Sequence, residues 1–112
     1  MHIRERAIGS ATVLDVTGDM IMGRNAREFR DSIDSLVARA RRRIVINLGG
    51  VSYVDSAGLG ELLAARTAVA MSGGQIRLVN LTHRIDELLI ITKLSTVFEI
   101  CSDENQAVLD FH

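Results

Sequence analysis

The chain has 112 residues, and 47% of them are hydrophobic, which is enough for one domain, residues 1–112, with a core of its own. Its 13 basic and 14 acidic residues leave a net charge of −1, which excludes the strongly basic field needed to bind nucleic acid or an anionic membrane. The lone Cys101 excludes an internal disulfide. No apolar run reaches the roughly 20 residues of a membrane span, and the first residues lack the apolar core of a secretory signal, so we expect a cytoplasmic protein.

The chain is expected to begin with a β-hairpin. Residues 2–8 and 11–17 flank Gly9-Ser10, and a two-residue link with glycine first suits a type II′ turn. The glycines at both ends of residues 18–23 then predict a loop.

An amphipathic helix follows this loop. Arg27/Asp31 and Arg30/Asp34 are spaced to pair across its outer face, and the arginines at 41–43 suit the negative end of a helix dipole better than they suit a nucleic-acid site. The apolar residues that recur at steps of three and four on the other face are Ala26, Phe29, Ile33, Leu36, Val37 and Ala40.

A short apolar strand at residues 44–48 is typical of the centre of a sheet that helices cover. The chain then passes through a glycine-bearing loop to Asp55-Ser56, where a second helix begins, and this helix ends at Gly73-Gly74. One side of it carries small residues, which suit either close docking of a partner or simple helix formation. They are Ala57, Gly60, Ala64 and Ala68, followed by Met71.

The remaining elements alternate. We expect a strand at 75–80, a short helix capped by Thr82, a strand at 97–101 with Cys101 as a small core residue, and a closing helix from residue 102 to Phe111. This order predicts an α/β fold with a mixed sheet, antiparallel at the hairpin and parallel afterwards, and about four helices. The order of the strands within the sheet stays open.

The start of the second helix is the candidate site. Asp55 or Ser56 can cap the helix, because their side-chain oxygens accept from backbone N–H groups that lack helical partners. The same N–H groups favour a phosphate, so we expect the Ser56 hydroxyl to face the solvent. Gly58 and Gly60 keep the first turn free of Cβ atoms, which would let another molecule come close.

Catalysis by the chain itself is not indicated. Neither a P-loop nor a Gly-x-Ser-x-Gly elbow surrounds Ser56, and the three histidines show no catalytic order. One cysteine and scattered histidines offer no metal site, and no cofactor is implied. Nucleotide binding is disfavoured because the glycines lack a basic partner.

The order of elements, and above all the segment Tyr53-Val54-Asp55-Ser56-Ala57-Gly58-Leu59-Gly60, resembles the STAS domain, in particular the small bacterial anti-sigma factor antagonists. In that family an anti-sigma factor serine kinase phosphorylates the serine after the aspartate, and a metal-dependent serine phosphatase removes the phosphate. The unmodified form binds the kinase and frees its sigma factor.

The resemblance implies that Ser56 accepts the phosphate and that Gly18-Asp19 begins a loop beside it. Met20 and Ile21 stand where relatives commonly carry another acid or polar residue. The resemblance leaves homodimerisation open. The residues expected to contact the partner are Gly18, Asp19, Asp55, Ala57, Gly58, Leu59, Gly60 and Ala64.

A second hypothesis is a constitutive scaffold or regulatory subunit of a stress-sensing or transport complex. Met20, Ile21 and Met22 would then form part of a permanent contact.

Overall fold

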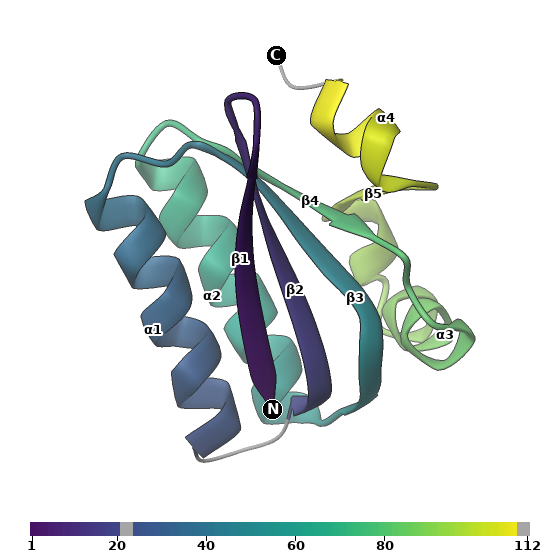
Figure 1. Cartoon of the computed structure of the whole chain (residues 1–112). Coiled ribbons are helices and arrows are strands. Elements are labelled where there is room, and N and C mark those ends of the chain that lie inside the picture. Colours follow the sequence, from purple (N-terminus) through teal and green to yellow (C-terminus); the bar gives the residue numbers. More distant parts are fainter. Residues whose placement is uncertain (21–23, 110–112) are drawn as a thin grey trace.

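The computed structural model describes residues 1–20 and 24–109, which contain a five-stranded mixed sheet with helices packed on both of its faces (Figure 1). The strands are β1 (His2–Ile8), β2 (Ala11–Met20), β3 (Arg43–Val54), β4 (Gln75–Val79) and β5 (Glu99–Cys101). The helices are α1 (Arg24–Ala38), α2 (Ser56–Met71), α3 (His83–Ile91) and α4 (Glu104–Leu109), and a short 3₁₀ helix, η1 (Leu94–Thr96), precedes β5.

The strands lie in the sheet in the same order as in the chain. β1 and β2 are antiparallel, whereas every later pair is parallel. Ile8 pairs with Ala11 across the turn, and Gly9 takes a φ of +58°, as the first position of the predicted turn requires. The predicted fold class is therefore confirmed, and the structure supplies the strand order that the sequence left open.

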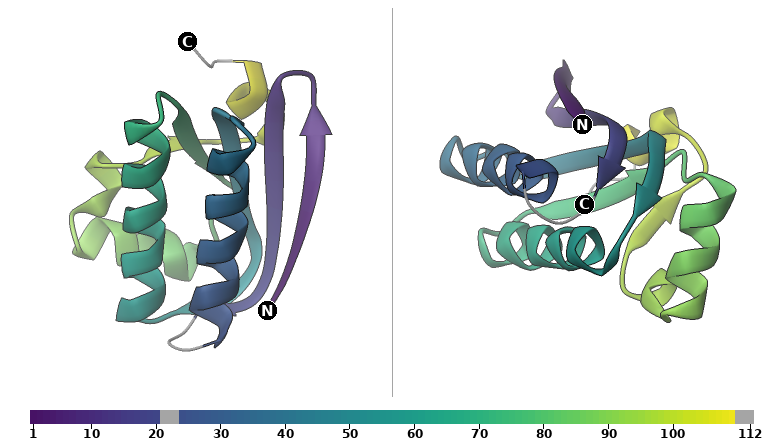
Figure 2. Two further views of the ribbon diagram at one scale, coloured as in Figure 1. Left: turned by 90° about the vertical axis from the view of Figure 1, so that its left-hand side faces the viewer. Right: turned by 90° about the horizontal axis from the view of Figure 1, so that it is seen from below.

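The main hydrophobic core lies between the sheet and helices α1, α2 and α3. α1 and α2 lie side by side on one face of the sheet (Figure 2). Alternate strand residues point to this core, so that Ile44 and Ile46 of β3 belong to it while Val45 faces the other way. On that opposite face α4 buries Ala107 against a smaller cluster formed by Val13, Val45 and Val79.

Two predicted loops are wrong, because the segments continue as strands. Gly18 and Asp19 belong to β2, and residues 49–54 belong to β3. The glycines serve irregular strand pairing: the β2–β3 register shifts twice near them, and Gly18 has a φ of +100°. A Cβ on Gly50 would lie 2.5 Å from Cγ2 of Thr17, so glycine at position 50 lets β2 and β3 approach. Residues 21–23 of the predicted loop lie outside the described residues.

Smaller differences have local causes. α1 ends at Ala38, before Ala40 with its φ of +59°. The last strand starts at Glu99 rather than residue 97, because η1 occupies the chain just before it. Cys101 is only half-buried, with Sγ 3.8 Å from Nη1 of Arg77. Phe111, expected in the last helix, lies outside the described residues.

Arg30 does not pair with Asp34 as predicted. It forms a bidentate ion pair with Glu61 of α2, at 3.0 and 2.7 Å. Tertiary packing thus replaces the expected pairing along one helix.

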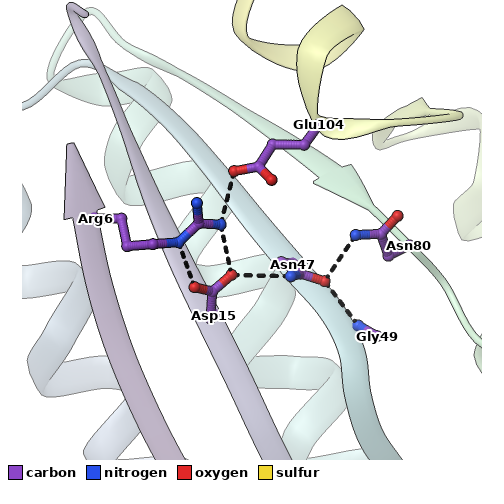
Figure 3. A network of polar contacts seen from close by, with 6 residues as sticks. All are labelled: Arg6, Asp15, Asn47, Gly49, Asn80 and Glu104. Atoms are coloured by element: carbon purple, nitrogen blue, oxygen red, sulfur yellow. Dashed lines mark hydrogen bonds and ion pairs between the residues drawn. The ribbon is translucent and has the colours of Figure 1, made fainter. Parts of the chain in front are cut away.

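A polar network fastens α4 to the first two strands (Figure 3). Arg6 of β1 donates from Nε and Nη2 to the two carboxylate oxygens of Asp15, at 2.5 and 2.9 Å, and from Nη2 to Oε1 of Glu104 at 2.7 Å. Asn47 of β3 also donates to Asp15, at 2.9 Å. The hydrogen bond from Arg6, with a smaller contribution from Asn47, holds the pKa of Asp15 below its ordinary value against the opposing effect of burial.

Candidate functional site

Asp55 is the residue that caps α2. Its Oδ1 accepts a hydrogen bond from the backbone N–H of Gly58 at 2.8 Å, and its carbonyl accepts from the N–H of Leu59 at 2.9 Å. Of the two capping candidates that the sequence offered, the structure selects Asp55, which leaves the hydroxyl of the next residue available.

Ser56 is the first residue of α2 and is exposed to solvent. The backbone N–H groups of Ser56 and Ala57 lie in the first turn of α2, where no carbonyl of the helix can accept a hydrogen bond from them. Both N–H groups therefore point out of the positive end of the helix dipole. A phosphoryl group on Ser56 would therefore meet two free donors and, beside it, the negative charge of Asp55.

Gly58 and Gly60 have different surroundings. Gly58 is buried, and a Cβ there would lie 2.9 Å from the carbonyl carbon of Met20 and closer still to its oxygen. That oxygen accepts a hydrogen bond from the N–H of Asp55 at 3.2 Å. The absence of a Cβ at Gly58 is thus required by the end of β2 within the domain itself, and contact of Gly58 with a partner stays a prediction. Gly60 is exposed, and a Cβ there would meet nothing within 4 Å.

The end of β2 brings Gly18 and Asp19 to the site. Asp19 is exposed and pairs with Tyr53, and Met20 pairs with Val54. The two residues were expected at the start of a loop, yet strand pairing places them beside the segment that leads to Ser56. Met20 is completely buried, so it cannot take part in the permanent external contact of the scaffold hypothesis. Ile21 and Met22 lie outside the described residues.

The outer face of α2 forms one wall of a groove against α1. Ala64 is exposed there, next to the Arg30–Glu61 ion pair, and the groove has a volume of about 220 Å³. Ala57 is half-buried. Leu59 is half-buried and packs against the main core, so it stabilises the fold as well as contributing to the surface.

Sequence reasoning missed two features near the site. The first is the contact between Gly58 and Met20, which local spacing cannot show. The second is the position of Tyr53, which is a strand residue and is 47% exposed. Simple alternation along β3 would not have indicated its exposure, because Ser52 and Tyr53 are both exposed between the buried Val51 and Val54.

The described residues, 1–20 and 24–109, contain no group of three or more His, Cys, Asp or Glu side chains able to hold a metal ion. Within the same ranges, every helix is too short or too polar to cross a membrane. The site itself presents an exposed serine at the N-terminus of α2, next to a carboxylate that is already hydrogen-bonded.

Comparison with known proteins agrees with this geometry. The family model of the STAS domain matches residues 2–107. The chain belongs to the STAS domain family. A STAS-domain containing protein of Pseudomonas aeruginosa is 31% identical over 94 residues, which are 84% of this chain and 91% of that protein. The anti-sigma-B factor antagonist of Bacillus subtilis is 36% identical over 63 residues, 56% of this STAS domain and 58% of the relative.

The solved structures show the same fold. The Bacillus anti-sigma factor antagonist SpoIIAA in its unphosphorylated form superimposes on this STAS domain with a TM-score of 0.74 at 14% identity, covering 97% of this chain and 96% of that one. Its phosphorylated form gives a TM-score of 0.72 at 16% identity, with 96% of each chain covered. The STAS architecture is thus shared over almost the full length.

Proposed function

We propose that this STAS domain is an anti-sigma factor antagonist controlled by phosphorylation of Ser56. The unmodified chain binds an anti-sigma factor serine kinase and so releases a sigma factor, the kinase transfers a phosphoryl group to Ser56, and a metal-dependent serine phosphatase removes it. The observation that carries the proposal is the exposure of the Ser56 hydroxyl at the first position of α2, directly after the capping Asp55.

The comparisons support the proposal at the level of the family. One relative is named an anti-sigma-B factor antagonist, and SpoIIAA has been solved with and without phosphate. The surface around Ser56 also suits a protein partner, since exposed Gly60 and Ala64 offer close approach along α2.

Electrostatics makes the modification an effective switch. A phosphoserine adds about −1.5 to −2 charges beside Asp55, and two unit charges about 4 Å apart interact by about 4 kcal/mol at an effective dielectric constant of about 20. Full reversal of a binding equilibrium requires about 5.5 kcal/mol. Repulsion, together with the cost of desolvating the phosphate in an interface, approaches that value. The helix dipole stabilises a phosphate at the N-terminus of α2 by only about 0.3 to 1 kcal/mol. Phosphorylation therefore weakens the complex more than it stabilises the free domain.

The test is a titration of each purified anti-sigma factor serine kinase encoded in the source genome with four forms of the chain. Wild type and Ser56→Ala should bind with similar affinity, whereas Ser56→Asp should bind at least tenfold more weakly because it places a second charge beside Asp55. Ser102→Asp is the matched control, because Ser102 is also exposed and lies close to a helix start, two residues before α4. It should bind like wild type.

Intact-mass measurement after incubation with ATP and the bound kinase completes the test. A gain of one phosphate that Ser56→Ala abolishes is the expected result. Equal affinities for Ser56→Asp and wild type, together with no phosphate on the wild-type chain, would contradict the proposal and leave a constitutive scaffold.

A further inference from the structure

Two large apolar side chains lie exposed over one shallow cavity between the end of β3 and helix α3. Tyr53 is 47% exposed and Ile91 is 77% exposed. The cavity has a volume of about 250 Å³, and Leu88 contributes to its wall. Tyr53, Leu88 and Ile91 are called the β3–α3 patch below.

Tyr53 and Ile91 of the patch lie outside the hydrophobic core, whereas Leu88 is partly buried and packs against it. The residues that anchor α3 to the domain most deeply are Ile85 and Leu89, both of which are buried. Leu88 and Ile91 are one turn apart on the helix, and Ile91 stays in water although it is strongly apolar. A cluster of exposed apolar side chains beside a cavity commonly marks a surface that binds another molecule.

The patch is continuous with the proposed phosphorylation site. Tyr53 is three residues before Ser56, so the chain can separate them by at most about 11 Å. A protein interface of ordinary size covers about 800 Å² on each partner, a region roughly 30 Å across. A partner interface of this size centred on Ser56 would therefore be wide enough to include Tyr53.

We infer that the β3–α3 patch is a second contact zone for the anti-sigma factor kinase, an inference that rests on the proposed function. The zone would receive an apolar surface of that partner, because an aromatic ring and two aliphatic side chains lie at its centre. Arg84 and Glu87 also line the cavity and carry opposite charges, so the patch resembles a protein interface, with its apolar centre and polar rim, more than a basic surface for a membrane or nucleic acid.

The experiment compares Ile91→Asp with Leu109→Asp. Ile91 is the last residue of α3 and Leu109 the last residue of α4, and the two are similarly exposed, at 77% and 80%. α4 packs on the other face of the sheet, away from the α1–α2 layer. Both substitutions thus place a carboxylate at the end of a helix, but only one lies in the patch. Tyr53→Thr, which keeps a strand-forming residue, tests the patch from β3.

Ile91→Asp and Tyr53→Thr should each raise the dissociation constant for the purified anti-sigma factor kinase about tenfold or more, while Leu109→Asp should leave it unchanged. Circular dichroism and thermal melts verify that each variant is folded. If Ile91→Asp and Tyr53→Thr bind like wild type while Ser56→Asp binds weakly, the patch inference is overturned and the proposed function stands.

Sedimentation of the chain without the kinase measures its oligomeric state and so tests whether a second copy of the chain occupies the patch instead. If wild type is a dimer that Ile91→Asp converts to a monomer without loss of kinase binding, the patch joins two copies of this chain and the inference is wrong. If Ser56→Asp binds like wild type while Ile91→Asp binds weakly, the patch inference survives and the switch at Ser56 fails.

Discussion

Replacing each of two glycines in α2 by alanine should change stability in opposite directions. Gly58 and Gly60 are two residues apart in the same helix, so the intrinsic gain from glycine to alanine is similar at both, about 0.5–1 kcal/mol. At Gly60 the new methyl group meets nothing within 4 Å, and the gain should appear in full. At Gly58 it meets the backbone of Met20 at 2.9 Å or less, and a backbone group cannot rotate away.

The cost at Gly58 follows from this contact. Carbon atoms pack best at roughly 3.5–4.0 Å, so α2 and the end of β2 must move apart by roughly 1 Å. Overpacking of this kind costs about 1–3 kcal/mol, and weakening the hydrogen bond from Asp55 to Met20 adds about 0.5–1.5 kcal/mol. After subtracting the helix gain, Gly58→Ala should lose about 2 kcal/mol, which lowers Tm by roughly 8 °C for a domain of this size.

Urea unfolding followed by circular dichroism measures both variants. The m-value should remain that of wild type, so that the midpoints report stability alone. Gly60→Ala should shift the midpoint upward and Gly58→Ala downward. If both variants shifted in the same direction by similar amounts, the contact between α2 and Met20 would not determine the need for glycine at position 58.

Three further outcomes are expected. The pKa of Asp15 is lowered in the folded state, so the stability that its ionised form contributes is complete above the unfolded pKa of about 4 and is lost as the pH falls through the lowered value. Urea midpoints measured from pH 6 to pH 3 should therefore decline less steeply for Asp15→Asn than for wild type. An equal decline for the two proteins would contradict the assignment. Arg6→Gln should lower the free energy of unfolding by about 1–3 kcal/mol, because Asp15 and Glu104 both lose a charged donor. An unchanged urea midpoint would show that the network does not stabilise the folded domain. Leu59→Arg should lower Tm because Leu59 packs on the core, and weaker kinase binding at an unchanged Tm would instead assign Leu59 to docking alone.

Periodicity predicted most of the fold. The stripe on α1, the two-residue turn of the hairpin and the alternation of later elements all depend on patterns within one segment. The exposure of Ser56 was also predictable, since a residue at a helix start is seldom covered by its own helix. Which of Asp55 and Ser56 caps α2 was not, because both side chains can accept the same N–H group.

The errors in the predicted loops and the missed contact of Gly58 with Met20 have one physical source. Glycine occurs both in turns and at places where two backbones pack closely. Gly18 and Gly50 permit bulges where β2 meets β3, and Gly58 permits the contact between α2 and β2. A single sequence cannot distinguish these uses, because the neighbour that demands a glycine is 33 or 38 residues away in two of the three cases. The Arg30–Glu61 pair was missed for the same reason.

The order of the strands has a consequence for biosynthesis. Since each strand is added beside the one made just before it, a nascent chain can extend the sheet outward from its first hairpin without waiting for a distant segment to return. β3, which leads into Ser56, finds β2 already available when it leaves the ribosome. The N-terminal end of α2, with Ser56, can therefore be organised before the last helix has been translated.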